Sequence, residues 1–403
     1  MTTTKPSLDR ASPHRRIAPI RVAILCDFLE EKWPSMDLVG DMLYRHLAVN
    51  CADDVKVNQL RPVLRRRFTR VPFVREDLGW NADRLVNRFA DYPLHLRNKG
   101  DDFDLFHIVD HSYAHLVYGL PAGRTVVTCH DLDTFRCLLG PVRENRPAWF
   151  RAMSRRILGG LQRASHVIAV SAATRDQLLE RDVLPMDRIS VVPNGVHPSC
   201  TRLSNPLADD AVSRLLPDDD PDRLWLLSVG NTLPRKRLDV LLRVFAAITR
   251  KIPKACLMRV GGLNPAQHQL AGELNIEHAM VNLPFLEREL LAAVYRRADL
   301  LLHTAEAEGF GLPLIEAMAC GCPVVASDVT VLREVGGDAT SYCPVADVET
   351  WKETVIRLSR ERIERPKMWE LRRQQGQDHA ARFSWAENAR QTASIYRRVM
   401  EDK

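Results

Sequence analysis

The 403-residue sequence lacks the features that mark several classes of protein. No apolar run approaches the roughly 20 residues of a membrane-spanning helix. The first 19 residues, MTTTKPSLDRASPHRRIAP, contain no apolar stretch of the kind that a secretory signal needs, and we expect a flexible leader there. Aromatic residues make up 6% of the chain, and no aromatic-rich RNA-binding motif or zinc finger is present. We therefore expect no nucleic-acid partner.

Cysteine occurs without a metal-binding or disulfide pattern. The nine cysteines are odd in number, and none lies in a Cys-x-x-Cys pair. The closest two, Cys320 and Cys322, have no further Cys or His at ligand spacing. We expect no metal site and no cofactor, and thiols that stay reduced in the cytoplasm.

The chain does contain enough apolar residues for more than one core. It is 45% apolar and 27% charged, as in ordinary globular proteins, and its length predicts two or three domains. Short apolar runs alternate with longer amphipathic stretches, which predicts an α/β protein with parallel sheets covered on both faces. The expected strands are residues 21–27, 55–60, 105–109, 125–129, 166–170, 189–192, 224–229, 255–260, 280–283, 300–303, 324–327 and 341–343.

The strand pattern starts again after residues 193–195, which predicts two doubly wound sheets. We expect an N-terminal domain over residues 20–196, a C-terminal domain over 197–383, and a last helix within 384–403 that follows the completed second sheet. Ligands of such sheets bind beyond the carboxyl ends of the strands. Candidate chemistry should therefore follow the strands, in a cleft between the two domains.

The most informative segment is residues 308–325, EGFGLPLIEAMACGCPVV. An expected strand feeds a glycine-bearing loop, and a helix opens near Gly311. Glycines let backbone N–H groups approach an anion closely, and the positive end of the helix favours a phosphate. Glu308 lies in the loop and Glu316 on the helix, where carboxylates can accept hydrogen bonds from sugar hydroxyls. The alternative is an ordinary loop whose acid stabilises the helix dipole.

This segment resembles the signature of the large family of retaining glycosyltransferases with the two-domain GT-B fold, family 4. Its members carry a Glu-x7-Glu motif, and Glu308 and Glu316 match it. Matching segments follow in the expected order: VVTCHD (126–131), VIAVSAATRDQLL (167–179), VVPNGV (191–196), SVGNTLPRKRLDVLL (228–242) and FSWAENARQTASIY (383–396). The resemblance implies two Rossmann-like domains, with the nucleotide sugar on the second. It also implies that the last helix crosses back onto the first domain.

Residues 230–237, GNTLPRKR, form the second candidate site. They follow the first strand of the second domain and precede a helix, so fixed cations there would meet a diphosphate. The resemblance implies that Arg235 and Lys236 neutralise the nucleotide diphosphate and that Gly230 and Asn231 border the donor. Solvated charges at a helix start are the alternative. No GxGxxG fingerprint follows any expected strand, which argues against a dinucleotide oxidoreductase.

The donor assignments implied by the resemblance are specific. Glu316 would hold the ribose and Glu308 the donor sugar. The amides of the glycine loop would meet the diphosphate, and the loop residues concerned are Gly309, Phe310, Gly311 and Leu312.

Two histidine-containing segments of the first domain are acceptor-side candidates. His130 and Asp131 follow the expected strand 125–129, and the resemblance implies that His130 faces the donor sugar. Packing and helix capping are the alternatives. Residues 107–115, HIVDHSYAH, suggest a metal site, an acceptor surface formed by Asp110, His111 and Tyr113, or capping and packing. We favour the acceptor surface, because the family pattern needs no metal.

Two further stretches bear on the acceptor. Residues 60–75, LRPVLRRRFTRVPFVR, are the densest basic stretch and are either a solvated surface or a contact for an anionic acceptor or anionic lipid. Residues 28–37, FLEEKWPSMD, depart from the glycine-rich loop of many relatives, which weakens any transfer of acceptor contacts to this loop. Ser35 there is an expected helix N-cap.

The resemblance implies a metal-independent retaining hexosyltransferase of class EC 2.4. It would move a sugar from a nucleotide-diphosphate sugar to a sugar, polysaccharide or lipid-linked acceptor. We expect a cytoplasmic protein, with peripheral contact at the inner membrane face as an option. Two alternatives stay open: another GT-B enzyme, such as a nucleotide-sugar epimerase or a phosphorylase, and a non-catalytic nucleotide-sugar-binding protein.

Overall fold

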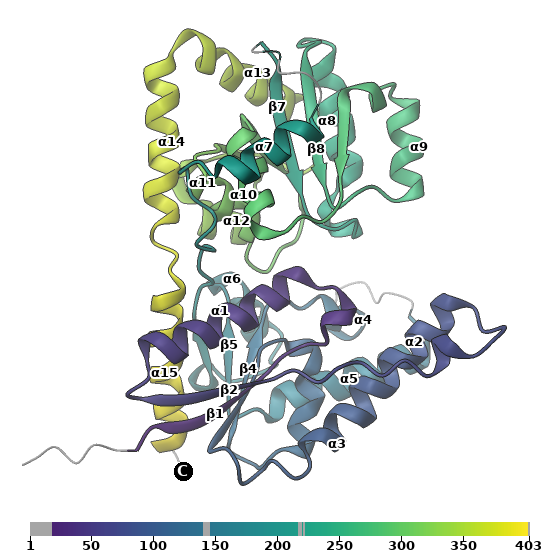
Figure 1. Ribbon diagram of the computed structural model, residues 1–403, viewed down its shortest axis with the longest axis vertical. Coiled ribbons are helices and arrows are strands. Elements are labelled where there is room, and N and C mark those ends of the chain that lie inside the picture. The colour runs from purple at the N-terminus through teal and green to yellow at the C-terminus, as the bar shows by residue number, and fades with distance from the viewer. Residues whose placement is uncertain (1–17, 140–145, 217–219, 221, 402–403) are drawn as a thin grey trace, which may run out of the picture.

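A computed structural model describes residues 18–139, 146–216, 220 and 222–401, which form two α/β units, one above the other in Figure 1. The expected leader therefore falls almost entirely outside the described residues. The first sheet is parallel throughout, with strand order β2-β1-β3-β4-β5-β6. Its strands are β1 (Ile20–Leu25), β2 (Val55–Leu60), β3 (Leu105–Ile108), β4 (Thr125–Cys129), β5 (His166–Ala169) and β6 (Ile189–Val191).

The second sheet repeats this design with strand order β12-β11-β10-β7-β8-β9, again all parallel. Its strands are β7 (Leu224–Val229), β8 (Ala255–Val260), β9 (Met280–Leu283), β10 (Leu300–His303), β11 (Val324–Ser327) and β12 (Thr340–Cys343). Every strand expected from the sequence is present, with ends shifted by no more than two residues. The doubly wound α/β fold is thereby confirmed.

Helices cover both faces of each sheet, which explains why the central strands are continuous apolar runs. Those of the first unit are α1 (Pro34–Asn50), α2 (Glu76–Val86), α3 (Tyr92–Leu96), α4 (Arg136–Leu139), α5 (Ala148–Arg163) and α6 (Ala172–Glu180). Those that follow are α7 (Pro206–Leu215), α8 (Leu238–Thr249), α9 (Pro265–Glu273), α10 (Arg288–Arg297), α11 (Leu312–Ala319), α12 (Thr330–Gly336), α13 (Val348–Glu364), α14 (Pro366–Ala380) and α15 (Trp385–Glu401).

One expected helix cap is wrong. Helix α1 begins at Pro34, and Trp33 occupies the N-cap position without a side-chain hydrogen bond, so Ser35 lies inside the first turn. Proline suits this first position, because its fixed φ matches the helix and it has no N–H to leave unpaired.

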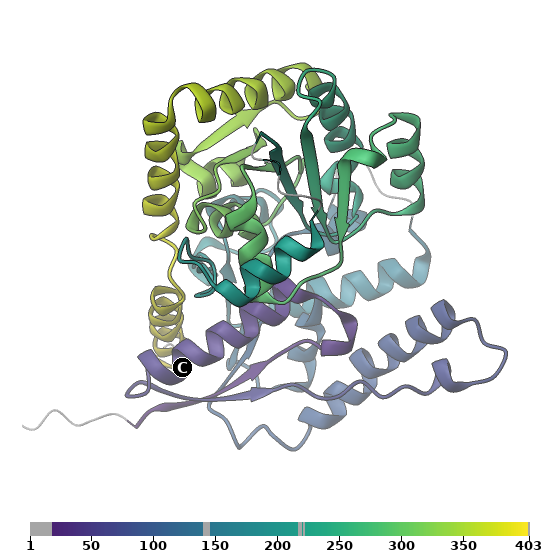
Figure 2. The same cartoon turned by 45° about the horizontal axis from the view of Figure 1, so that its top comes forward.

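The last helix, α15, packs on the first sheet, although it follows the second in sequence (Figures 1 and 2). Its buried residues Ala389, Ala393 and Tyr396 join a core cluster with β1 and β3. The Tyr396 hydroxyl lies 2.6 Å from Nδ1 of His107, whose Nε2 lies 2.7 Å from the Thr128 hydroxyl. A polar contact thus fixes the position of α15 within an apolar core.

The connection between the two units is held against the start of α15. The amide of Asn388 donates to the carbonyl of Pro193 at 2.7 Å, and the N–H of Val196 donates to the carbonyl of Phe383 at 3.0 Å. A Cβ on Gly195 would lie 2.3 Å from the backbone nitrogen of Trp385, so only glycine fits there.

Candidate active site

Loops that follow β4, β7 and β10 meet where the two units face each other. The loop after β7 contains a short 3₁₀ helix, Pro234–Lys236, and the loop after β10 leads to α11. The two loops lie side by side, because the Thr304 hydroxyl donates to the carbonyl of Lys236 at 3.0 Å and the N–H of Glu306 donates to the carbonyl of Arg235 at 2.9 Å. The cations and the Glu-x7-Glu segment are therefore in direct contact.

Glu308 is surrounded by positive charge. Its carboxylate forms an ion pair with Nζ of Lys236, lies 3.3 Å from Nη1 of Arg235, and lies 2.9 Å from Nε2 of His303. Burial alone would raise the pKa of Glu308, but Lys236, His303 and Arg235 together hold it well below its usual range. Glu308 is thus a buried, ionised carboxylate that sets the positions of both cations.

Arg235 reaches across to the first unit. Its Nε lies 2.5 Å from Oδ2 of Asp133, and its Nη2 lies 3.3 Å from Oδ2 of Asp131. Asp131 comes directly after His130 at the end of β4. The structure therefore joins the expected donor cation to the acceptor-side segment by ion pairs. Asp133 was missed, although it lies only two residues from Asp131.

The glycine loop packs tightly on the first unit. A Cβ on Gly309 would lie 1.7 Å from the carbonyl oxygen of His130, and the Gly309 carbonyl accepts a hydrogen bond from Ser171 at 2.8 Å. Gly311 caps α11 with φ +96°, a left-handed conformation that favours glycine. Glycine at these two positions thus permits close approach of the two units and the sharp entry into α11.

Phe310 and Leu312, the other two expected donor residues of this loop, have side chains in apolar clusters. Phe310 is buried with Val170, Ile315 and Val335, and Leu312 packs against a cluster that includes Trp385. Only their backbone is suited to a polar ligand.

Glu316 lies on α11 and is 3% exposed. Its Oε2 accepts a hydrogen bond from the Tyr295 hydroxyl at 3.1 Å. Its Oε1 lies 3.5 Å from Nη1 of Arg288 and has no hydrogen-bond partner among the residues that the structure describes. Burial raises the pKa of this carboxyl, against the opposing effects of Arg288 and Tyr295. One carboxylate oxygen is therefore left to accept a hydrogen bond from a ligand.

Gly230 and Asn231 are held by an arginine inside the sheet. Arg259, the last residue but one of β8, is 1% exposed and donates to the carbonyls of Gly230 at 2.7 Å and Asn231 at 3.1 Å. Burial lowers its pKa to about 10. A charged residue inside the apolar run ACLMRV was a visible signal for this supporting role, which sequence reasoning missed.

Of the first-unit candidates, Asp110, His111, Tyr113 and His130 are buried and Asp131 is half-buried, and His130 bonds to His111. His130 donates from Nε2 to the carbonyl of Val109 at 2.7 Å, and burial lowers its pKa. The backbone N–H of His130 donates to Nδ1 of His111 at 3.3 Å, which leaves His111 Nε2 3.7 Å from Oδ1 of Asp131. Asp110 accepts from the Ser112 N–H at 2.8 Å and so caps the turn that follows β3.

Tyr113 faces a charge cluster that the sequence did not reveal. Its hydroxyl donates to Oε2 of Glu31 at 3.0 Å, and the guanidinium of Arg88 lies 4.0 Å from its ring centre. The other oxygen of Glu31 lies 3.1 Å from Nε of Arg84. Glu31, one of the acidic residues in segment 28–37, thus has structural partners on α2 and in the turn after β3.

No group of three His, Cys, Asp or Glu residues within 18–139, 146–216, 220 and 222–401 is arranged to hold a metal ion. Within the same ranges, all nine cysteines are free and buried. The helices of the described part of the chain lack the length and apolar character that crossing a membrane requires.

Comparison with solved structures defines the class of fold. A sucrose-phosphate synthase from Thermosynechococcus elongatus superposes with a TM-score of 0.70 at 20% identity, covering 95% of this chain and 100% of the other. Anabaena HepE in complex with UDP and glucose gives a TM-score of 0.68 at 16% identity, covering 93% and 99%. The fold is that of the GT-B glycosyltransferases.

Family comparison then identifies the chain more closely. A model described as Glycosyltransferase Family 4 matches residues 47–199, and one described as Glycosyl transferases group 1 matches residues 217–377. Together the two matches span most of the chain, which belongs to this glycosyltransferase family.

Two relatives illustrate the range of the family. A D-inositol 3-phosphate glycosyltransferase of Nocardia farcinica is 34% identical over 239 residues, which are 56% of this chain and 51% of the relative. An O-antigen chain mannosyltransferase B of Escherichia coli is 26% identical over 284 residues, 68% of this chain and 70% of the relative. The chain spans about half the length of two D-inositol 3-phosphate glycosyltransferases that it matches.

Proposed function

We propose that this chain is a retaining glycosyltransferase that moves a hexose from a nucleotide-diphosphate sugar to a glycan or glycolipid acceptor. The observation that carries the proposal is the arrangement around α11. Arg235 and Lys236 lie beside the loop that opens this helix, and Glu316 on the same helix has a carboxylate oxygen without a hydrogen bond. Cations for a diphosphate and an acceptor for a ribose hydroxyl therefore occur at one site.

Each donor group has a matching partner in this arrangement. The ribose hydroxyls donate to Glu316, and the diphosphate lies between Arg235, Lys236 and the amides of the Gly309–Gly311 loop, with Gly230 and Asn231 bordering it. Negative charge grows on the leaving phosphate as the glycosidic bond breaks. Fixed cations and a helix N-terminus stabilise that charge most strongly in the transition state. We propose that this charge stabilisation takes the place of a metal ion.

Glu308 acts through position and charge in this proposal. Its ion pairs hold Lys236 and Arg235 in place before the donor binds. We also propose that its carboxylate contacts the donor sugar. The acceptor hydroxyl attacks from the face of the leaving group, the new bond forms to the anomeric carbon, and the departing phosphate takes the proton. The anomeric configuration is thereby retained.

His130 lines the acceptor side in this proposal, with Asp110, His111, Tyr113 and Asp131 around it. The nine reduced cysteines fit a cytoplasmic location. Peripheral contact with an anionic membrane surface belongs to the same proposal, because it would bring a glycolipid acceptor to the first unit.

Donor turnover tests the proposal. Purified protein is incubated in EDTA with UDP-, GDP-, ADP- and TDP-sugars, with and without candidate acceptors, and released nucleotide is measured. We expect release from one donor, lost in Glu316→Ala and Lys236→Ala, and a product whose anomeric configuration by NMR matches the donor.

Other outcomes would contradict the proposal in distinct ways. Interconversion of the sugar without transfer would indicate an epimerase, and dependence on inorganic phosphate a phosphorylase. Binding of a nucleotide, seen as thermal stabilisation, without turnover of any donor would indicate a non-catalytic protein. Activity that EDTA abolishes and a divalent ion restores would refute the metal-independent mechanism.

A further inference from the structure

The segment between β2 and α2 carries more positive charge than its surroundings neutralise. Residues 61–75 include six arginines and no acidic residue. Three of the arginines have carboxylate partners in the first unit: Arg61 with Asp41 at 3.0 Å, Arg67 with Asp91 at 2.6 Å, and Arg75 with Asp77 at 3.0 Å. The other three, Arg65, Arg66 and Arg70, are exposed and have no carboxylate partner in the described part of the chain.

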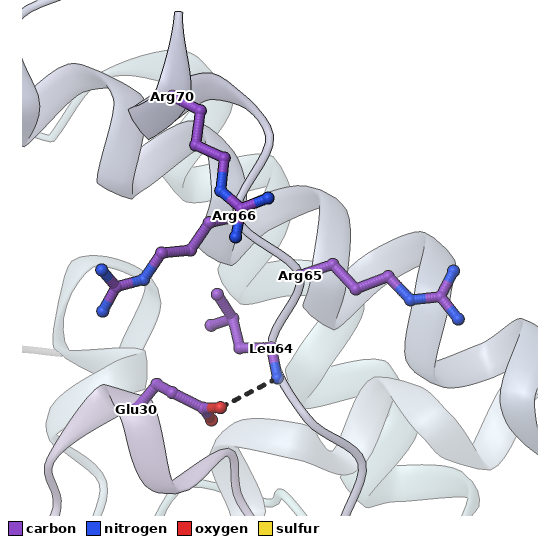
Figure 3. Close-up of a pocket in the computed structure, with 5 residues that line it drawn as sticks. All are labelled: Glu30, Leu64, Arg65, Arg66 and Arg70. Carbon is purple, nitrogen blue, oxygen red and sulfur yellow. Dashed lines mark hydrogen bonds between the residues drawn. The ribbon is translucent and has the colours of Figure 1, made fainter.

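These three arginines line one cavity of about 490 Å³, together with Glu30 and Leu64 (Figure 3). Glu30 uses one oxygen to accept a hydrogen bond from the Leu64 N–H at 3.3 Å. With three positive charges against one negative charge, the cavity attracts anions. Guanidinium groups are well suited to phosphate oxygens, which they can bind through two parallel hydrogen bonds.

The backbone that carries the arginines is held in place by hydrogen bonds to side chains of Asp83 and Asn87. Both carboxylate oxygens of Asp83, on α2, accept hydrogen bonds from the backbone N–H groups of residues 67–69 at 2.8–3.1 Å. Burial would raise the pKa of Asp83, but these N–H groups and a threonine hydroxyl lower it to about 2. Asn87 adds a pair of hydrogen bonds to the backbone of Arg65, at 2.8 Å each. The arginines are therefore displayed on an ordered surface.

Large apolar side chains surround this charge and are also exposed. They are Phe68, Val71, Phe73, Val74 and Leu78. Phe73 is fully exposed and has φ +70°, a conformation that is unfavourable for an aromatic residue and gains no packing in the isolated chain. In Figures 1 and 2 this stretch runs from β2 to the outer end of α2, at the edge of the first unit. Arginines and bare apolar side chains thus share one protruding edge.

We infer that residues 61–78 are a docking surface for a membrane rich in anionic phospholipid. Arg65, Arg66 and Arg70 bind headgroup phosphates, and Phe73 with its apolar neighbours enters the boundary with the acyl chains. Combined basic and apolar contact is what reversible attachment to such a surface requires, since each kind of contact alone is weak. The inference rests on the membrane contact in the proposed function and needs no step of the transfer reaction.

The docking surface adjoins the acceptor side through one short turn. Glu30 lines the arginine cavity, and its neighbour Glu31 accepts a hydrogen bond from Tyr113 at 3.0 Å. Arg84 of α2 also contacts Glu31, at 3.1 Å. A membrane bound at residues 61–78 therefore lies next to the first-unit cluster that would receive the sugar end of a glycolipid.

Vesicle sedimentation of the full-length chain tests this inference. One vesicle population is phosphatidylcholine alone, and the other also contains phosphatidylglycerol. We expect binding to the anionic vesicles only, weakened by salt. Replacing Arg65, Arg66 and Arg70 together by Gln should reduce the partition coefficient about 100-fold, at roughly fivefold for each arginine. A control that replaces the exposed Arg214, Arg250 and Arg360 of the second unit by Gln has the same net charge and should bind like the wild type.

The apolar contribution has its own variant. Phe73→Gly suits the left-handed backbone, so the fold should be kept or stabilised, while vesicle binding should fall by about tenfold or more. Equal binding to neutral and anionic vesicles would overturn the inference, as would unchanged binding of the triple arginine variant. Loss of vesicle binding in inorganic phosphate, but not in chloride of equal ionic strength, would also overturn it and identify a site for a soluble phosphate ligand. Nucleotide release without vesicles, measured on the same samples, reports separately on the donor site.

Discussion

The buried Oε1 atom of Glu316, which has no hydrogen-bond partner in the described part of the chain, leads to a prediction with two effects of opposite sign. Glu316→Gln keeps the shape of the side chain but removes its charge and one of its two acceptor oxygens. A hydrogen bond to a charged group contributes about 1.5–3 kcal/mol. Because about 1.4 kcal/mol corresponds to tenfold in affinity, nucleotide binding should weaken by about 10- to 150-fold.

The same substitution should stabilise the protein without ligand. The pKa of Glu316 is raised in the folded state, so ionisation favours the unfolded chain, and the wild type loses stability as pH rises through that pKa. The neutral Gln lacks this cost. The melting temperature at neutral pH should therefore rise slightly in Glu316→Gln, and the difference from the wild type should shrink in acid.

Calorimetry and thermal melts check both effects with the nucleoside diphosphate that stabilises the wild type most. The matched control is Glu306→Gln, whose carboxylate lies in the same loop but pairs with Arg237 at 2.9 Å. A nucleotide that lacks both ribose hydroxyls should bind the wild type weakly. It should bind Glu316→Gln with about the same affinity as it binds the wild type. Additive losses, or a Kd for Glu316→Gln within twofold of the wild type, would refute the assignment of Glu316 to the ribose.

Three further outcomes follow from contacts already described. Asp133→Asn should remove one of the three carboxylate contacts of Arg235 and tighten nucleotide binding up to about fivefold, measured by calorimetry, since a partly exposed ion pair contributes at most about 1 kcal/mol; weaker binding would contradict this. Gly195→Ala should lower the melting temperature sharply, because its Cβ meets backbone 2.3 Å away, whereas Gly119→Ala, with open space around it, should change little. Burial lowers the pKa of His107 to about 3, so as the pH falls the unfolded chain takes up a proton at this group before the folded chain does. The free energy of unfolding, measured in urea, should therefore fall by about 2 kcal/mol for this group between about pH 7 and pH 5. In His107→Gln this part of the pH dependence should be lost.

The sequence was sufficient to predict the strands, because in a doubly wound sheet each central strand is a short apolar run between amphipathic helices. It was also sufficient to predict that Glu308, Glu316, Arg235 and Lys236 lie in loops or helices that follow such strands; their roles at a donor site stay predictions. The start of α1 was missed at Ser35, because proline at the first helical position competes with a serine cap. Those local features are encoded over a few neighbouring residues.

Contacts between segments far apart in the sequence could not be predicted from such local patterns. The ion pair of Arg235 with Asp133 joins residues about a hundred positions apart, and no local pattern indicates which carboxylate an arginine will reach. The cluster of Glu31, Arg84 and Tyr113 depends in the same way on how α2 returns to the first sheet. For Arg259 the sequence did contain a local signal, because a charge within an apolar strand indicates a buried polar partner. Only the fold identifies that partner as the Gly230 loop.

The return of α15 to the first sheet has a consequence for how the chain is made. During synthesis, β1 to β6 emerge long before α15, so the face of the first sheet that carries Val22, Ile24 and Leu105 is covered only in part, by Leu43 and Leu47 of α1, until α15 leaves the ribosome. The second unit can complete its own sheet in the meantime. Premature termination before residue 385 would therefore damage the earliest part of the protein most, by leaving an aggregation-prone apolar surface on the first unit while the second unit folds.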